Sequence, residues 1–109
     1  DPKLYSRVIS NLIINGIQAV LEGKKPQILV KLVFEGDNHI KLIIKDNGKG
    51  ISEEFKTKVF MPNFSTKTEG SGLGLAIAKR GVETAGGKIW FETTSGSGTT
   101  FYLLFPLIP

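Results

Sequence analysis

The sequence predicts an α+β domain in which helices form one layer and a β-sheet forms the other. Two segments repeat apolar residues at spacings of three and four, as amphipathic helices do. Two pairs of segments rich in β-branched and aromatic residues flank short polar turns, as hairpin strands do. A helix with one apolar stripe buries that stripe against a neighbouring layer. Because the 109 residues contain no repeat and no linker, we expect residues 1–109 to form a single domain.

The first half of the chain is expected to hold one helix and one hairpin. The helix is predicted over residues 3–22, because Asp1-Pro2 is a start signal and Gly23-Lys24-Lys25-Pro26 is a stop signal. The hairpin strands are predicted over residues 27–35 and 40–46. The polar turn between them contains the single histidine, His39, which we expect to be exposed.

The second half is expected to repeat this order after a short helical turn over residues 52–59. Residues 62–72 form no regular pattern. A second helix is predicted over residues 73–85, since Gly86-Gly87 can end it. A second hairpin is predicted from strands over residues 88–94 and 99–107.

Composition excludes several classes of function. The chain has no cysteine, so disulfides, thiolate zinc sites and cysteine nucleophiles are excluded. One histidine can form neither a multi-histidine metal centre nor a Ser-His-Asp triad with the sequence around it. No apolar run approaches the ~20 residues that span a bilayer. The net charge of +4 suits nucleic acid, and it equally suits a pocket for nucleotide phosphates.

The first predicted helix carries a polar stripe along one face. Its members recur at helical spacing and are Arg7, Asn11, Asn15, Gln18 and Glu22. A solvated helix face would explain the pattern. Asparagine is nevertheless a mediocre helix former, and its amide oxygen is a good ligand for a hard cation such as magnesium. Both interpretations stay open on the pattern alone.

Asp46-Asn47-Gly48-Lys49-Gly50-Ile51 directly follows an apolar strand. These residue types favour a strand-ending turn. Alternatively, Asp46 is partly buried and needs a hydrogen-bond donor. An adenine amine would supply one, and Gly48 and Gly50 would let the ring lie against bare backbone.

Glycines at positions 70, 72 and 74 lead directly into the second predicted helix. Exposed N–H groups at a helix start attract anions, and glycines let a phosphate approach them. A flexible turn would use the same glycines, and the pattern is neither a P-loop nor a full dinucleotide fingerprint. Lys67, just upstream, could neutralise phosphate charge. Phe60 and Phe64 are expected to anchor this segment to the core and to serve as the hinge of a lid.

The order of these motifs resembles the catalytic ATP-binding domain of sensor histidine kinases, within the GHKL superfamily of gyrase, chaperone, histidine kinase and mismatch-repair ATPases. Asn11-Leu-Ile-Ile-Asn15 resembles the N box, and Asp46-Asn-Gly48-Lys-Gly50 resembles the G1 box. Phe60-Met-Pro-Asn-Phe64-Ser-Thr-Lys67 is similar to the F box, Gly70-Ser-Gly72-Leu-Gly74-Leu75 to the G2 box, and Gly98-Thr99 to the last Gly-Thr motif.

This resemblance implies a Bergerat-type two-layer α/β sandwich, with about three helices on a mixed, mainly antiparallel sheet. It implies ATP and Mg²⁺ as cofactors, with Asn15 as the metal ligand and with Asn15 and Lys67 as the catalytic residues. Asp46 would bind the adenine amine, and Thr99 would assist through water. The implied ATP-binding residues are Asn11, Asn15, Asp46, Gly48, Gly50, Ile51, Phe60, Phe64, Lys67, Gly70, Ser71, Gly72, Leu73, Gly74, Leu75 and Thr99.

The sequence departs from the family pattern at four positions. Gly16 stands where alanine is usual, and Gly81 where a large aliphatic residue is common, so each helix is expected to lose about 1 kcal/mol. Gln18 and Ala19 stand where many relatives carry a phosphate-contacting basic residue and a tyrosine beside the adenine. Those two contacts are therefore not carried over to this chain. The implied lid, at most residues 65–70, is short, and residues 63–72 are expected to be the most mobile.

The function implied by the resemblance is a histidine kinase domain that donates the γ-phosphate of ATP to a histidine on a separate helical domain. That dimerisation and phosphoacceptor domain, which is expected to lie outside this sequence, and a response regulator are the expected partners. Neither nucleic acid nor a membrane is expected to bind. The expected location is the cytoplasm, whether or not the parent protein is anchored in a membrane. The alternatives are a GHKL ATPase or chaperone module, an anti-sigma-type serine kinase, and a non-catalytic nucleotide-binding module.

Overall fold

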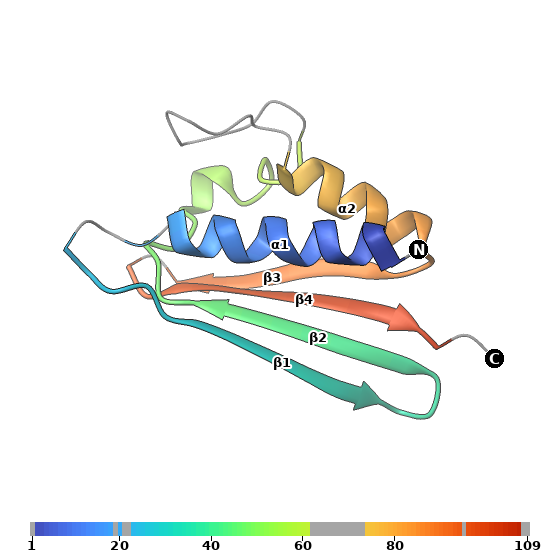
Figure 1. The fold of residues 1–109 in the computed structure, drawn as a ribbon. Coiled ribbons are helices and arrows are strands. Elements are labelled where there is room, and N and C mark those ends of the chain that lie inside the picture. Colours follow the sequence, from blue (N-terminus) through green and yellow to red (C-terminus); the bar gives the residue numbers. More distant parts are fainter. Residues whose placement is uncertain (1, 19, 21–22, 62–73, 95, 108–109) are drawn as a thin grey trace.

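A computed structural model describes residues 2–18, 20, 23–61, 74–94 and 96–107 (Figure 1). Two α-helices lie on one face of a four-stranded sheet, which confirms the predicted α+β, two-layer class. The elements in chain order are α1 (Pro2–Gln18), β1 (Ile28–Glu35), β2 (His39–Asp46), the 3₁₀ helix η1 (Glu53–Phe55), α2 (Gly74–Thr84), β3 (Lys88–Thr94) and β4 (Gly98–Pro106).

The strand order in the sheet is β1-β2-β4-β3. Both predicted hairpins are present as the antiparallel pairs β1–β2 and β3–β4. The central pair, β2–β4, joins the two hairpins and is also antiparallel, with Ile44 opposite Phe101. Within the described residues every pairing is therefore antiparallel. The central pairing also determines the position of the candidate site described below, because it places the end of β2 beside the start of β4.

Three local expectations differ from the structure. Helix α1 ends at Gln18 rather than at residue 22, and its last turn tightens through a bond of 3.3 Å from the Val20 N–H to the Ile17 carbonyl. His39 is the half-buried first residue of β2 and lies outside the turn. Residues 52–59 form a 3₁₀ helix followed by turns, not a continuous helix. The predicted lid lies within residues 62–73, which are outside the described residues.

The core lies between the two layers. Each helix contributes two fully buried side chains, and the two central strands contribute the rest. The buried residues of this cluster are Val8, Leu12, Leu42, Ile44, Ala78, Val82, Phe101 and Leu103. The ring of Phe60 packs against this core at centroid distances of 5.8 Å from Phe91 and 6.3 Å from Phe101. Phe60 therefore anchors the segment after η1 to the sheet, as predicted.

Edge strand β1 keeps apolar side chains in solvent. Val30, Leu32 and Phe34 share the helix-side face of the sheet with their β2 partners, yet they are 47%, 66% and 74% exposed. The helices pack on the central strands and on Ile28 at the start of β1, and they leave the rest of this edge uncovered (Figure 1). On the opposite face, Tyr102 stacks on Trp90 and donates a hydrogen bond of 2.5 Å to Glu92. That bond to a carboxylate raises the pKa of Tyr102 above its usual value.

The start of β4 passes unusually close to the end of β2. Gly98 has a φ of +120°, and a Cβ atom at this position would lie 2.1 Å from the Asp46 carbonyl oxygen. Only a residue without a side chain allows this approach, so Gly98 determines how closely the two strand ends meet.

Substitution of Gly98 by alanine is expected to lower the free energy of unfolding by about 3 kcal/mol or more, because it adds a collision with backbone to an unfavourable φ. Gly96→Ala is the matched control. Gly96 also has a positive φ, +84°, but nothing lies within 4 Å of its added Cβ, so we expect a loss of about 1 kcal/mol. Urea denaturation measures both values. Equal losses for the two variants would contradict the close approach.

Candidate functional site

The carboxylate of Asp46 lies at the junction of the two central strands. Asp46 is the last residue of β2 and is only 7% exposed. Its Oδ1 accepts hydrogen bonds from the Gly48 N–H at 2.8 Å and from the Thr99 N–H at 3.1 Å. The first bond closes the turn after β2, and the second ties that turn to β4. The predicted partial burial of Asp46 is confirmed.

The second carboxylate oxygen has a different environment. None of the described residues donates a hydrogen bond to Asp46 Oδ2. Gly16 of α1 lies beside it: a Cβ added to Gly16 would lie 3.4 Å from Oδ2 and 2.9 Å from Cδ1 of Ile28. The absence of a side chain at Gly16 thus lets the helix approach the carboxylate closely. A buried carboxylate with a free acceptor oxygen is suited to bind a ligand that donates.

The loop over residues 47–51 is held from both sides. The Asn47 side chain accepts a hydrogen bond from the Gln27 N–H at 2.8 Å and donates one to the Lys25 carbonyl at 3.0 Å. On the other side, the Lys49 carbonyl accepts a bond of 2.6 Å from the Gly96 N–H. Gly50 has a φ of +78°, which favours glycine. The loop is therefore fastened both to the segment before β1 and to the β3–β4 turn.

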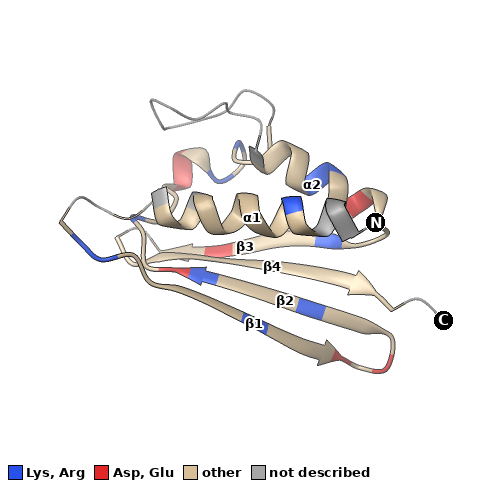
Figure 2. Cartoon of the chain, in the orientation of Figure 1, with Lys and Arg blue, Asp and Glu red and all other residues tan. Residues whose placement is uncertain are grey.

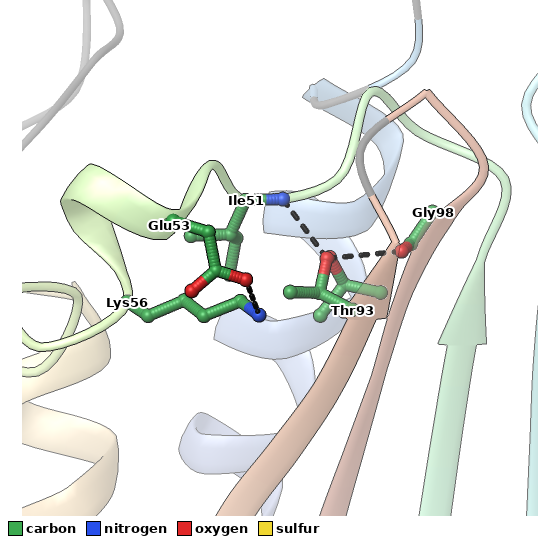
Figure 3. A network of polar contacts seen from close by, with 6 residues as sticks. Ile51, Glu53, Lys56, Thr93 and Gly98 are labelled. Atoms are coloured by element: carbon green, nitrogen blue, oxygen red, sulfur yellow. Dashed lines mark hydrogen bonds and ion pairs between the residues drawn. The ribbon is translucent and has the colours of Figure 1, made fainter.

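Thr93 connects this loop with β4 (Figure 3). Its hydroxyl accepts a hydrogen bond from the Ile51 N–H at 2.9 Å and donates one to the Gly98 carbonyl at 3.1 Å. The same hydroxyl lies 2.9 Å from the hydroxyl of Thr99. Thr93 thus joins Ile51, Gly98 and Thr99 beside Asp46. Figure 3 also shows the ion pair between Glu53 and Lys56, with an N–O distance of 2.6 Å, on the exposed surface nearby.

The predicted polar face of α1 lies to one side of its buried residues. Val8, Leu12 and Gly16 face the core, and Asn11 is half-buried. Asn15 lies one turn after Asn11 in the same helix, and its side chain is outside the described part of the structure. Its predicted metal contact therefore stays a prediction.

Of the remaining predicted site residues, some lie in the described part of the chain and the others lie outside it. Gly74 and Leu75 are the first residues of α2, so the second predicted helix is present and begins at Gly74, one residue later than predicted. The ring of Phe60 is occupied by its core contacts and by the ammonium group of Lys79, 5.3 Å from the ring centroid. The predicted site residues outside the described part of the chain are Phe64, Lys67, Gly70, Ser71, Gly72 and Leu73.

Two residues of the site were missed by sequence reasoning. Thr93 could have been found from the alternation along β3. It is a hydroxyl residue on the strand face that is half-buried, whereas its two neighbours in the chain are exposed. Asn47 was interpreted only as a turn former, and its two long-range bonds depend on how the segment before β1 folds back.

The described residues were also compared with the requirements of a charged patch, a metal cluster and a membrane span. Figure 2 shows basic residues on β1 and β2, and η1 carries two acidic residues, Glu53 and Glu54. The described residues contain no group of three or more His, Cys, Asp or Glu side chains that could hold a metal ion. Neither described helix is long and apolar enough to cross a membrane.

Comparison with known families gives a match along the whole chain. The model of the "Histidine kinase-, DNA gyrase B-, and HSP90-like ATPase" family matches residues 1–109. The chain is 37% identical over 107 residues to the sensor histidine kinase ZraS of Klebsiella oxytoca, covering 98% of this chain and 23% of that protein. It is 35% identical over 109 residues to the signal transduction histidine-protein kinase AtoS of Escherichia coli, covering 100% of this chain and 18% of that protein.

Solved structures resemble the fold along the same length. The mycobacterial sensor histidine kinase MprB has a TM-score of 0.87 and 28% identity, over 100% of this chain and 76% of that one. A nucleotide-free catalytic domain of the histidine kinase ThkA has a TM-score of 0.85 and 32% identity, over 100% of this chain and 71% of that one. The chain thus corresponds to most of a solved catalytic domain and to less than a quarter of the length of ZraS and AtoS.

Proposed function

The chain belongs to the histidine kinase-, DNA gyrase B- and HSP90-like ATPase family of ATP-binding domains, and from this membership and the site's geometry we propose that it is the catalytic domain of a sensor histidine kinase. The domain binds Mg-ATP and donates the γ-phosphate to a histidine on a separate dimerisation and phosphoacceptor domain. A response-regulator aspartate then receives the phosphoryl group. The cytoplasm supplies the ATP for this reaction.

The observation that carries the proposal is the free oxygen of the Asp46 carboxylate. Oδ1 is used by two backbone N–H groups, which fix the carboxylate, and Oδ2 is left for a donor. The amino group of adenine is such a donor. Gly48 is buried two residues after Asp46. Because glycine has no side chain, we assign its backbone as a surface on which the base lies. A charged hydrogen bond in such a site contributes about 1.5–3 kcal/mol.

We assign the triphosphate to the start of α2 and the segment that precedes it. The backbone N–H groups at the start of a helix attract phosphate oxygens, and Gly70, Gly72 and Gly74 give them access. Lys67 adds a positive charge. Ile51, Leu73 and Leu75 are assigned apolar contacts with the nucleotide, and Phe60 and Phe64 hold the base of the segment in place.

We assign Mg²⁺ to Asn15 together with phosphate oxygens of the nucleotide. Magnesium prefers oxygen ligands and keeps several waters, so one amide oxygen from the protein is sufficient when phosphates supply the rest. When bound, the ion would supply positive charge that neutralises the phosphates. The phosphoryl group moves when an imidazole nitrogen of the acceptor histidine forms a bond to phosphorus and the bond to the ADP oxygen breaks. Positioning and charge neutralisation are the main demands of this reaction.

The alternative activity, ATP hydrolysis, requires activation of a water molecule. In hydrolysing members of the superfamily a glutamate lies one helical turn before the magnesium-binding asparagine. This chain has Asn11 at that position, half-buried on α1. An amide is not a useful base near neutral pH, so the ~10²–10⁴-fold effect of general-base catalysis is not available from it. The kinase proposal is therefore favoured over the ATPase and chaperone alternatives.

Asp46→Asn is expected to weaken ATP and ADP binding alike, by about ten- to hundredfold. The amide oxygen can still accept from Gly48 and Thr99, but the amide NH₂ group replaces Oδ2 and faces the donor of adenine. Calorimetry measures both affinities. Asp37→Asn, the same change in the exposed β1–β2 turn, is the matched control. Wild-type affinity for ADP in Asp46→Asn would contradict the base assignment.

Asn15→Ala is expected to abolish phosphotransfer and to weaken nucleotide binding mainly when magnesium is present. Alanine is the better helix former, so the helix itself should not be weakened by the loss of the amide. Affinity for ATP is measured with magnesium and with a chelator, and the exposed Ser10→Ala on the same helix is the control. An equal loss of affinity under both conditions would point away from a metal ligand.

The isolated domain is expected to release phosphate from ATP far more slowly than the ~1 s⁻¹ of an ordinary enzyme. Addition of the histidine-bearing domain of the parent protein should produce a phosphorylated histidine on that domain. A phosphate-release assay and an acid-labile phosphorylation assay measure the two outcomes. Steady release at ~1 s⁻¹ or more by the isolated domain would favour the ATPase alternative.

A further inference from the structure

The sheet face opposite α1 and α2 carries no helix within the described residues (Figure 1). We call it the open face. One row of side chains crosses it from strand to strand, because Ile43 lies opposite Tyr102, and Tyr102 lies opposite Trp90. These residues alternate along their strands with those that face the helices, so they point away from the core. An uncovered sheet face is normally polar, whereas the centre of this one is apolar and aromatic.

The two rings of the row form a rigid pair. Trp90 is 36% exposed and stacks on Tyr102, with ring centroids 5.5 Å apart and ring planes inclined by 16°. The Tyr102 hydroxyl is fixed by its hydrogen bond to Glu92. Rings that are already held in place lose little conformational freedom when a partner packs on them. Tryptophan and tyrosine are also the residue types that contribute most to protein interfaces.

The open face is basic. Its charged residues are Lys31, Lys41, Lys45, Lys88, Glu35 and Glu92. Glu35 forms an ion pair of 3.3 Å with Lys41, and Glu92 is used by Tyr102. The other three lysines are exposed and have no carboxylate partner among the described residues.

These three lysines surround the apolar row. Lys31 lies opposite Ile43 and so continues the row onto β1. Lys45 lies opposite Thr100, on one side of Tyr102, and Lys88 lies opposite Leu104, on the other side. An apolar centre with a rim of one charge is complementary to a partner that has an apolar centre and a rim of the opposite charge.

We propose that the open face is a docking surface for an acidic amphipathic helix of a partner protein. Neighbouring strands lie about 4.8 Å apart, and successive turns of a helix lie about 5.4 Å apart. A helix that crosses the strands can therefore place one apolar side chain on each of Ile43, Tyr102 and Trp90. Carboxylates beside this apolar stripe then face Lys45 and Lys88. The inference goes beyond the proposed function and does not depend on it.

The charge pattern disfavours two other occupants. A second copy of this chain would bring one basic face against another, because a twofold interface pairs the same surface with itself. Nucleic acid carries charge along its whole length and is matched by a continuous basic stripe. Here the aliphatic side chains of Ile43 and Leu104 separate Lys45 from Lys88. Charged groups on both sides of an apolar stripe fit this spacing.

The probe is a synthetic amphipathic helix with leucine along one face and glutamate on both flanks. Trp90 is the single tryptophan of the chain, so its fluorescence reports directly on the open face. We expect a saturable shift of the emission to shorter wavelength with this peptide, and weaker binding at higher salt, since the rim charges are screened. The same peptide with lysine in place of glutamate, and a single-stranded oligothymidine, should give no saturable shift.

Two variants test the apolar centre and the basic rim. Calorimetry should show that Trp90→Ala weakens peptide binding by about 30-fold. Lys31→Glu combined with Lys88→Glu should weaken it by about tenfold. Lys58→Glu, the same charge change at an exposed lysine outside the open face, is the matched control and should bind as the wild type does. Thermal unfolding checks that each variant is folded. If the double reversal does not fold, Lys31→Gln with Lys88→Gln replaces it, with an expected loss of about threefold.

Three results would overturn the inference: no saturable binding of the acidic peptide, equal binding of the acidic and basic peptides, or wild-type affinity in both the Trp90 and the lysine variants. Tighter binding of oligothymidine than of the acidic peptide would overturn it in favour of nucleic acid. ATP affinity should be unchanged in the lysine variants, because the open face lies opposite the helices. Failure of the wild-type domain to bind ATP would overturn the proposed function alone.

Discussion

The two hydrogen bonds from backbone N–H groups to Asp46 Oδ1 are the interaction on which the geometry of the site depends. A carboxylate that is 7% exposed is costly to bury unless donors compensate it. Here the donors come from the next turn and from a strand 53 residues further along the chain. Because one oxygen satisfies this structural need, the other is left for a ligand. The same side chain therefore serves the fold and, in the function proposed above, the binding of the base.

The sheet topology makes this arrangement possible. Hairpins β1–β2 and β3–β4 form locally, but only the antiparallel β2–β4 pair brings the end of one hairpin beside the start of the other. Gly98 then permits an approach that a side chain would block. Helix α1 closes on the junction through Gly16, where any Cβ would be in tight contact with Ile28 and Asp46. The loss of helix propensity at Gly16 is thus offset by close packing of the helix against the site.

The fold class and the main elements could be predicted from the sequence, because apolar periodicity and turn residues determine them locally. The hairpin β1–β2 is an example, since its alternation and its polar turn are both visible in the sequence. The end of α1 could not be predicted, because the apolar pattern continues to Val20 while the last turn tightens after Ile17. The exposure of Val30, Leu32 and Phe34 also depends on which strands the helices cover, and no residue in β1 signals that choice.

The site was predicted only in part, because local motifs reveal some of its residues and long-range contacts determine the others. Asp46, Gly48 and Thr99 lie in motifs whose order is recognisable, and the structure brings these three together. Thr93 lies outside any motif, and its importance comes only from the approach of Ile51, Gly98 and Thr99 in space. Asn47 is similar, since its partners Lys25 and Gln27 precede it by 22 and 20 residues. Sequence spacing thus identified the residues proposed to contact the nucleotide better than the residues that hold them in place.

We propose that a nucleotide base binds where Asp46 joins β2 to β4. An ATP titration of the ¹⁵N-labelled domain, followed by NMR, tests it most directly. We expect saturable shift changes that are large at the amides of Gly48, Ile51 and Thr99, with the amides of Leu32 and Phe34 on the edge strand unchanged. Changes centred on β1, or no saturable change at the junction, would contradict it.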